Sequence, residues 1–428
     1  MQDKIYFHLD ANSAFLSWSA AYRTLILGES LDLRTIPSVV GGNQEKCHGI
    51  VLAKSVPAKK YGIQTGEPLI SAQKKCPNLV IIPPDYHLYA TTSKAFMEKL
   101  MQYSNNIIQY SIDEAWMEFT GCEHLWGSPV AFAHQLKEEI KQELGFTVNV
   151  GISTNKLLSK MAGGFKKPDR VHTLFPEEIP YKMWPLPVTE LFWVGKATYT
   201  KLKKLGITTI GELAHADINI IRANLKKPGE IIYNYANGGE LEEYVAERPN
   251  VKGYGNSMTA PWDITNYTFA EHILLSLCET TAARIRADNF RVSCVDIHLV
   301  YTNFEYIGTQ CQLSSPTDVT EEIYRAAKTL LYRLWDGVNP VRQIGVHTSK
   351  VTVDSGRQYN VFDMYRYDRL ERWDKTIDKI RARFGEDSVF RASYLKAPIS
   401  HMSGGLDKER RTSVTVGIDL NKEQYIEV

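Results

Sequence analysis

The sequence has few cysteines, and none of the six stands in a C-x-x-C pair. Zinc and iron–sulfur centres are usually held by such pairs, so we expect neither kind of centre. Long apolar runs are also missing, since no stretch approaches the roughly 20 residues that cross a bilayer. The first ten residues, MQDKIYFHLD, carry charges on both sides of a short apolar run, unlike a secretory signal. These absences predict a soluble, cytoplasmic protein that binds no membrane.

A strong net charge is missing as well. The formal charge is +1, which gives no whole-chain signal for nucleic-acid binding. Residues 156–204 nevertheless hold ten Lys or Arg against four Asp or Glu. This local excess suits a phosphate backbone, although a solvated helical face would look the same. Residues 254–355 hold eight basic against eleven acidic residues, so any DNA contact there needs one basic face.

The length of 428 residues is too great for one hydrophobic core and predicts about two to four domains. Strands and helices in the first 165 residues do not alternate regularly, which indicates an α+β domain with an antiparallel sheet. Residues 35–76 form a short α/β insert within it. From residue 165 to about 243 the chain looks all-helical, and residues 244–253 have the composition of a linker.

Residues 254–355 predict a second α+β domain. Its elements follow the β-α-β-β-α-β order of ferredoxin-like domains, with helices at 269–287 and 320–335. A tail follows at 356–428. Within the tail, residues 365–384 predict an amphipathic helix that we expect to pack on the protein body or on a partner. Its apolar stripe consists of Leu370, Trp373, Ile377, Ile380 and Phe384.

Two adjacent acids, Asp113 and Glu114, stand inside the apolar segment QYSIDEAWMEFTG. A carboxylate near a core is costly unless it is paired or binds a metal. A third acid, Asp10, ends the first predicted strand, and pairing of that strand with a strand at 107–119 would bring the three together. Neighbours on a strand point to opposite faces, so a local bend is also needed. Such a set suits divalent cations, whereas surface salt bridges would not need the apolar surroundings.

The segment FWVGKATYTKLKKLGITTIGEL at 192–213 resembles a helix–hairpin–helix unit. Val194 and Gly195 would form its turn, beside Lys196 and Lys201. Such a turn directs backbone N–H groups at a DNA phosphate and reads no bases. We expect this segment to bind DNA, with an ordinary helical hairpin as the alternative.

In combination these segments resemble the Y-family (translesion) DNA polymerases, the group of DinB and UmuC. The resemblance runs from about residue 4 to about 390. Its motifs are HLDANSAFLSW, AKSVPAKKYGIQTGEPLISAQKKCP, YSIDEAW and VGISTNKLLSKMA, followed by the helix–hairpin–helix run and the second α+β domain.

The resemblance implies an α+β multidomain fold shaped as a polymerase right hand. The ferredoxin-like palm would comprise residues 1–34 and 77–165, and the small fingers residues 35–76. The thumb with its helix–hairpin–helix unit would follow at 166–243, and the β-α-β-β-α-β little finger at 254–355.

The implied activity is low-fidelity, template-directed DNA polymerisation in translesion synthesis and DNA repair. Two Mg²⁺ ions would activate the primer 3′-hydroxyl and neutralise the leaving group. The resemblance assigns the catalytic and metal-binding roles to Asp10, Asp113, Glu114 and the Ala11 carbonyl.

The resemblance also implies contacts to the incoming dNTP, at Ser13, Ala14, Phe15, Lys59 and Lys160. The Phe15 ring would exclude a 2′-hydroxyl, although a helix core would also accept an aromatic residue there. Ala53, Val56 and Lys59 stand where DinB has Thr, Tyr and Arg, and AKSVPAK is closer to UmuC. Loss of a bidentate Arg predicts a weaker grip on the triphosphate. The branch, DinB or UmuC, stays open.

The tail segment QYNVF resembles a Q-x-x-[LV]-F sliding-clamp peptide. Gln358 would enter a polar spot, and Val361 and Phe362 an apolar pocket. The expected partners are therefore primer–template DNA, dNTP and a sliding clamp, for a monomer associated with the nucleoid.

Two other functions fit part of the pattern. Nucleotide cyclases and related phosphotransferases carry similar acids on palm-like folds, but they lack the helix–hairpin–helix run and the second α+β domain. A DNA-binding accessory protein with a degenerate site is disfavoured by the intact set of Asp10, Asp113 and Glu114.

Overall fold

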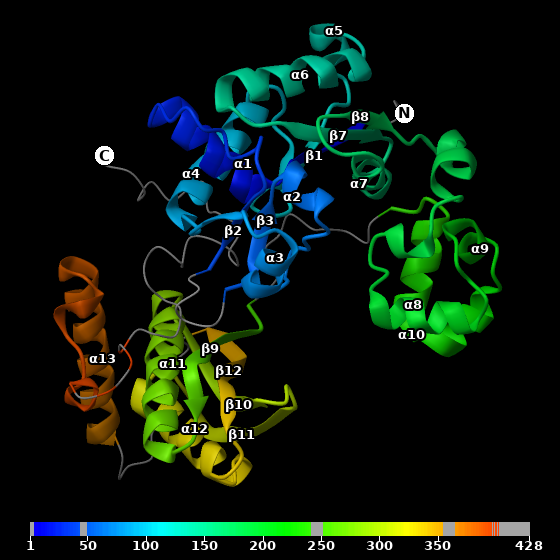
Figure 1. The fold of residues 1–428 in the computed structure, drawn as a ribbon. Coiled ribbons are helices and arrows are strands. Elements are labelled where there is room, and N and C mark those ends of the chain that lie inside the picture. The colour runs from blue at the N-terminus through cyan, green and yellow to red at the C-terminus, as the bar shows by residue number, and fades with distance from the viewer. Residues whose placement is uncertain are drawn as a thin grey trace. The chain divides into compact units, whose positions relative to one another are not determined.

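A computed structural model describes residues 4–42, 49–240, 251–353, 364–395, 397, 399 and 401. The chain divides into two compact units (Figure 1). The first takes the described residues up to 240, and the second takes those from 251 onward. None of the helices in these ranges is both long and apolar enough to cross a membrane.

The first unit is built on a five-stranded sheet with the order β5-β6-β1-β7-β8. Its strands are β1 (Tyr6–Ala11), β5 (Ile107–Gln109), β6 (Glu114–Glu118), β7 (Val148–Ser153) and β8 (Val171–Thr173). Neighbouring strands are antiparallel except β7 and β8, which are parallel. The central strand β1 is buried on both sides: Phe7 and Leu9 face one layer of helices, and His8 faces the other.

Helices cover both faces of this sheet (Figure 1). One face packs on α1 (Ala14–Ala21), α4 (Tyr86–Met101) and α6 (Pro129–Leu144), and the other on α7 (Lys156–Gly164). Polar side chains cap several of these helices at their N-termini, where backbone N–H groups lack helical partners. The caps of α4, α6 and α7 are Asp85, Ser128 and Asn155, each accepting a backbone N–H three residues on.

A smaller three-stranded sheet, with the order β3-β2-β4, forms the insert. It consists of β2 (Ser38–Gly41), β3 (Val51–Lys54) and β4 (Val80–Ile82), with helices α2 (Val56–Lys60) and α3 (Leu69–Lys75). Its own small core includes Val39, Val51, Ile63 and Leu69, all buried. The insert therefore has a small core of its own, whereas Val40, Ala53 and Ile82 of the same sheet belong to the main core.

The chain after residue 165 contains α8 (Lys196–Lys204), α9 (Ile210–Ala214) and α10 (Ile218–Ala236), preceded by short 3₁₀ and π turns. The prediction that this region is all-helical is wrong at β8. Val171 and Thr173 are β-branched, and they extend the sheet as a parallel partner of β7. The α10 helix is interrupted at Lys226, where φ is +55°, just before Pro228.

The second unit has the predicted β-α-β-β-α-β order. Its elements are β9 (Gly253–Ile264), α11 (Tyr267–Ala287), β10 (Phe290–Tyr301), β11 (Tyr306–Thr317), α12 (Thr320–Leu334) and β12 (Val341–Val353). The sheet order is β11-β10-β12-β9, with all neighbours antiparallel. The core between this sheet and the two helices is continuous.

The predicted tail helix is present as α13 (Met364–Phe384), and it packs on α11. The apolar stripe belongs to its packing face only in part: Leu370, Ile377 and Ile380 are half-buried, but Trp373 is 59% exposed and Phe384 is 66% exposed. Asp374 and Arg381 are buried instead. They pair with Arg286 and with a buried glutamate of α11, so ionic partners select the charged face of the helix.

Candidate active site

Strand pairing brings the predicted carboxylates together. In the register of β1 with β6, Asp10 lies directly opposite Glu114. The Ala11 N–H donates to the Asp113 carbonyl at 3.0 Å, which ties the residue before Glu114 to the end of β1. The predicted pairing of the first strand with the 107–119 segment is therefore confirmed.

The segment 107–119 is not one strand but a hairpin. β5 pairs with β6, and the N–H groups of Tyr110 and Ser111 donate to the Glu114 carbonyl at 3.0 and 3.2 Å. Asp113 thus lies in the turn, while Glu114 opens β6. This is the bend that adjacent carboxylates require in order to serve one site.

Burial and mutual repulsion act on Asp10 and Asp113. Burial raises the pKa of Asp113, and the charges of Asp10 and Glu114 raise it further, against a Ser111 hydrogen bond that lowers it. Burial also raises the pKa of Asp10; the Lys167 ammonium lowers it, and the Glu114 charge raises it. The carboxylates are therefore close enough to disfavour one another's charge.

Glu114 differs from the two aspartates. Burial alone would raise its pKa, but the His8 hydrogen bond and the Lys160 charge lower the pKa to about 2. His8 Nε2 lies 3.2 Å from Glu114 Oε2, and the Lys160 ammonium pairs with the same oxygen. Glu114 is consequently held as a carboxylate in a largely covered position.

Two lysines occupy the site. Lys160, expected from the resemblance to contact a triphosphate, is paired with Glu114. Lys167 was not predicted, yet its Nζ lies 2.7 Å from Asp10 Oδ1 and its side chain is 38% exposed. The only sequence signal for Lys167 was the local excess of basic residues at 156–204.

No group of three His, Cys, Asp or Glu side chains among the described residues is arranged to hold a metal ion as it stands. Asp10, Asp113 and Glu114 each bond a different donor: Lys167, Ser111 and Lys160. The donor chemistry nevertheless fits a hard cation, which prefers carboxylate oxygens. A divalent ion would also relieve the repulsion among these acids.

The start of α1 lies directly after Asp10. Ser13 adopts φ +51°, an uncommon value for a residue with a side chain, and its hydroxyl makes no capping hydrogen bond to the helix. Ala14 is buried and opens the helix. Phe15 is half-buried, with its ring stacked on Tyr89 at a centroid distance of 4.4 Å. Tyr89 is fully buried, so the Phe15 ring packs against a side chain that is fixed in the core.

The remaining predicted contact residues differ in their exposure. Lys59 is exposed near the end of α2. In the helix–hairpin–helix segment, Val194 is buried and Gly195 precedes α8, with open space beside it. Lys196 and Lys201 on α8 are exposed. The clamp-like residues Gln358, Val361 and Phe362 lie outside the described residues.

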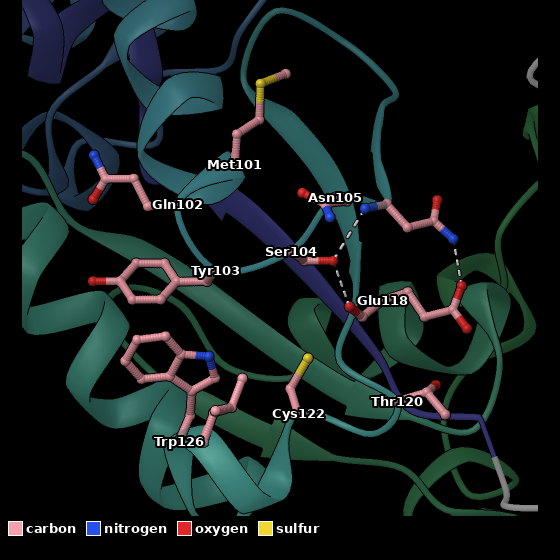
Figure 2. Close-up of a pocket in the computed structure, with 11 residues that line it drawn as sticks. Met101, Gln102, Tyr103, Ser104, Asn105, Glu118, Thr120, Cys122 and Trp126 are labelled. Atoms are coloured by element: carbon pink, nitrogen blue, oxygen red, sulfur yellow. Dashed lines mark hydrogen bonds between the residues drawn. The ribbon is translucent and has the colours of Figure 1, made fainter.

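A shallow pocket of about 490 Å³ lies at the end of β6 away from Glu114 (Figure 2). Tyr103, Asn105, Cys122 and Trp126 are among the residues that line it. The Ser104 hydroxyl donates to the Glu118 carbonyl within it. None of the three carboxylates of the candidate site contributes to its lining, so the pocket is separate from that site.

Comparisons with known proteins identify the family of this chain. Two models of the impB/mucB/samB family match residues 9–164 and, for the C-terminal domain, residues 251–361. DNA polymerase IV of Clostridium acetobutylicum is 43% identical over 92% of this chain and 98% of its own length. DNA polymerase IV of Moorella thermoacetica is 37% identical over 90% of this chain and 94% of its own length. DNA polymerase IV 2 of Bacillus subtilis is 31% identical over 93% of this chain and 96% of its own length. A Y-family DNA polymerase chimera of known structure, 21% identical, covers 82% of this chain and 99% of its own with a TM-score of 0.68, which shows a shared α+β multidomain fold.

Proposed function

Because the chain belongs to the impB/mucB/samB family of Y-family DNA polymerases, we propose that Asp10, Asp113 and Glu114 are the catalytic carboxylates of a translesion DNA polymerase. The polymerase extends a primer 3′ end with dNTPs under the direction of a template. The observation that carries the assignment is the register that sets Asp10 opposite Glu114 with Asp113 in the adjoining turn. The relatives named DNA polymerase IV put the chain on the DinB-like side, although AKSVPAK is closer to UmuC.

The proposal also gives each group of elements a domain role. The five-stranded sheet and its helices serve as the palm (residues 1–34 and 77–165). The insert at 35–76, whose strands β2 and β3 share a sheet with β4 of the following segment, serves as the fingers. The helical segment at 166–243 is the thumb, and the β9–β12 domain is the little finger (254–355). The fingers are small, which limits geometric checking of the new base pair and suits synthesis across damaged templates.

Two Mg²⁺ ions would be held by Asp10, Asp113, Glu114 and the Ala11 carbonyl. When bound, they lower the pKa of the attacking primer hydroxyl and neutralise charge on the departing pyrophosphate. For this to happen, Lys167 has to leave Asp10. Its ammonium then becomes available to the triphosphate at the rim of the site.

The start of α1 supplies further contacts to the dNTP. The first N–H groups of a helix have no helical partner and favour anions, so Ser13, Ala14 and Phe15 offer donors to phosphate oxygens. Tyr89 keeps the Phe15 ring in place, where it would collide with a 2′-hydroxyl. Lys59 reaches the triphosphate from the fingers. We assign the second lysine contact to Lys167 rather than to Lys160.

DNA contacts complete the proposal. The turn at Val194 and Gly195, with Lys196 and Lys201, binds backbone phosphate without reading bases. The segment from Gln358 to Phe362 recruits a sliding clamp, and the polymerase acts as a monomer.

Primer extension with Mg²⁺ tests the proposal. The wild-type chain should extend a primer on a template and stop when Mg²⁺ is chelated, whereas Asp113→Ala should not extend it. Glu118→Gln, on the far end of the same strand β6, is the matched control and should retain activity. Failure of the wild-type chain to extend any primer would refute the function, and extension by Asp113→Ala would refute the site. A cyclase would instead form product without primer or template.

A further inference from the structure

Lys160 is enclosed by three aromatic rings as well as by Glu114. Its Nζ lies 4.5 Å from the ring centre of Tyr110, 5.5 Å from that of Phe192 and 5.9 Å from that of Trp116. All three distances fall within the range of cation–π attraction, which strengthens where water is excluded. The side chain of Lys160 is only 15% exposed. A lysine held in this way is poorly placed to reach a nucleotide in solution.

The two carboxylate oxygens of Glu114 differ in their contacts. His8 and Lys160 both bond Oε2, and no donor among the described residues bonds Oε1. His8 itself is buried, with its ring packed beside Trp116 at 5.3 Å between ring centres. Lys160 also lies 3.5 Å from His8 Nε2. One carboxylate oxygen is thus anchored by two donors, and the other is left for a ligand of the active site.

The cage joins two parts of the first unit. Tyr110 and Trp116 come from the hairpin that carries the carboxylates, but Phe192 comes from the helical segment. Phe192 also packs against Tyr235 of α10, with ring centres 6.3 Å apart and planes 28° apart. The position of the helical segment therefore determines whether the third wall of the cage is present.

We propose that Lys160 is a positioning residue that orients Glu114, and that Phe192 couples the helical segment to this carboxylate through the cage. Movement of that segment away from the palm opens the cage, frees the Lys160 ammonium and lets Glu114 turn. Lys167 lacks this role, since it is 38% exposed and bonds Asp10 at the rim. The inference rests on the proposed polymerase activity and goes beyond it.

Two measurements distinguish a positioning residue from a triphosphate ligand. The first is the split between kcat and KM for dNTP in primer extension. The second is the dNTP dissociation constant on a primer with a dideoxy end, where no chemistry occurs. Lys160→Met should lower kcat at least tenfold and leave the dNTP dissociation constant within twofold. Lys167→Met should instead weaken dNTP binding about tenfold or more.

Lys160→Arg should recover part of the lost kcat, because it keeps a charge within the aromatic cage. Lys141→Met, an exposed lysine on α6 outside the site, is the control for loss of a positive charge. Melting temperatures of each variant show whether the first unit remains folded. If Lys160→Met weakens dNTP binding as much as Lys167→Met, Lys160 is a triphosphate ligand and the proposal fails.

A double-mutant cycle tests the coupling. Phe192→Leu should lower kcat several-fold with unchanged affinity for primer–template DNA. The double variant Lys160→Met/Phe192→Leu should be no slower than Lys160→Met alone, because both changes remove one interaction. Additive effects would overturn the coupling. Absence of extension by the wild-type chain would refute the proposed function itself, which separates the two failures.

Discussion

Gly151 lies where the five-stranded sheet packs closely against α7, the helix that carries Lys160. In β7 it pairs with His8, and α7 crosses above it. A Cβ atom at Gly151 would lie 2.0 Å from the Ser159 carbonyl oxygen and 2.3 Å from the Gly163 nitrogen. Both are backbone atoms, so no side chain can turn aside to make room. Gly151→Ala therefore has to push α7 away from the sheet.

The size of the effect follows from these distances. Real Cβ contacts essentially never fall below 3.0 Å, so α7 has to move by about 1 Å, and overpacking of that kind costs typically 1–3 kcal/mol, sometimes more. We expect about 3 kcal/mol for Gly151→Ala, because the moving helix buries Leu157, Leu158 and Ala162. For a unit of this size, that corresponds to a melting temperature lower by roughly 6–12 °C. The shift also draws Lys160 from Glu114, so kcat should fall.

Urea unfolding followed by tryptophan fluorescence, together with calorimetry, measures this loss. Gly164→Ala is the matched control, since it changes a glycine of the same helix with no atom within 4 Å of the new Cβ. That variant should be neutral or more stable by up to about 1 kcal/mol. An unfolding free energy of Gly151→Ala within about 0.5 kcal/mol of the wild-type value would refute the close packing of α7 on β7.

Three further predictions follow from the site and from the second unit. Phe15→Ala should raise incorporation of ribonucleotides at least tenfold relative to dNTPs, measured as a ratio of kcat/KM. An unchanged ratio would show that Phe15 is not the residue that excludes the 2′-hydroxyl. Asp113→Asn should abolish extension yet raise the melting temperature at pH 7 without metal, because burial and neighbouring charges disfavour the ionised form. Because the pKa of Asp113 is raised in the folded protein, its ionisation destabilises the wild-type fold only above the pKa of the unfolded chain, near pH 4. The gain in melting temperature of Asp113→Asn should therefore vanish below about pH 4. A gain that persists in acid would contradict the explanation. Arg286→Met should destabilise the second unit by about 3–5 kcal/mol in urea, since it leaves Asp374 buried without its arginine partner. The control Arg325→Met, which removes an exposed arginine, should change stability by less than about 1 kcal/mol. Equal effects would show that the contact of α13 with Arg286 contributes no stability.

Local sequence was sufficient for the helices predicted at 269–287, 320–335 and 365–384, which the structure has at Tyr267–Ala287, Thr320–Leu334 and Met364–Phe384. Local signals of another kind lie at the N-termini of further helices. Asp85, Ser128 and Asn155 each accept a hydrogen bond from a backbone N–H of the helix that follows, and such caps depend only on residues a few positions apart. Alternation of apolar residues similarly predicted the order of elements in the second unit. These signals involve residues that are close together in the sequence, so they can be recognised without knowledge of the tertiary fold.

Partners far apart in sequence were not predictable in this way. β8 forms a strand because it pairs with the edge of β7. The α13 helix packs through Asp374 because Asp374 pairs with Arg286 of α11. The spacing of apolar residues in α13 carries no information about ionic partners on another helix. The turn at 110–113 likewise depends on how β5 and β6 pair.

The amino-acid sequence by itself predicted which acids form the candidate active site, because Asp10, Asp113 and Glu114 stand in motifs whose residue types and spacing are specific. Only the tertiary structure decided what those acids touch. Lys160 pairs with Glu114 and Lys167 with Asp10 because strand register and the crossing of α7 set side-chain distances. Those distances arise from contacts over more than forty positions along the chain, which no local pattern encodes.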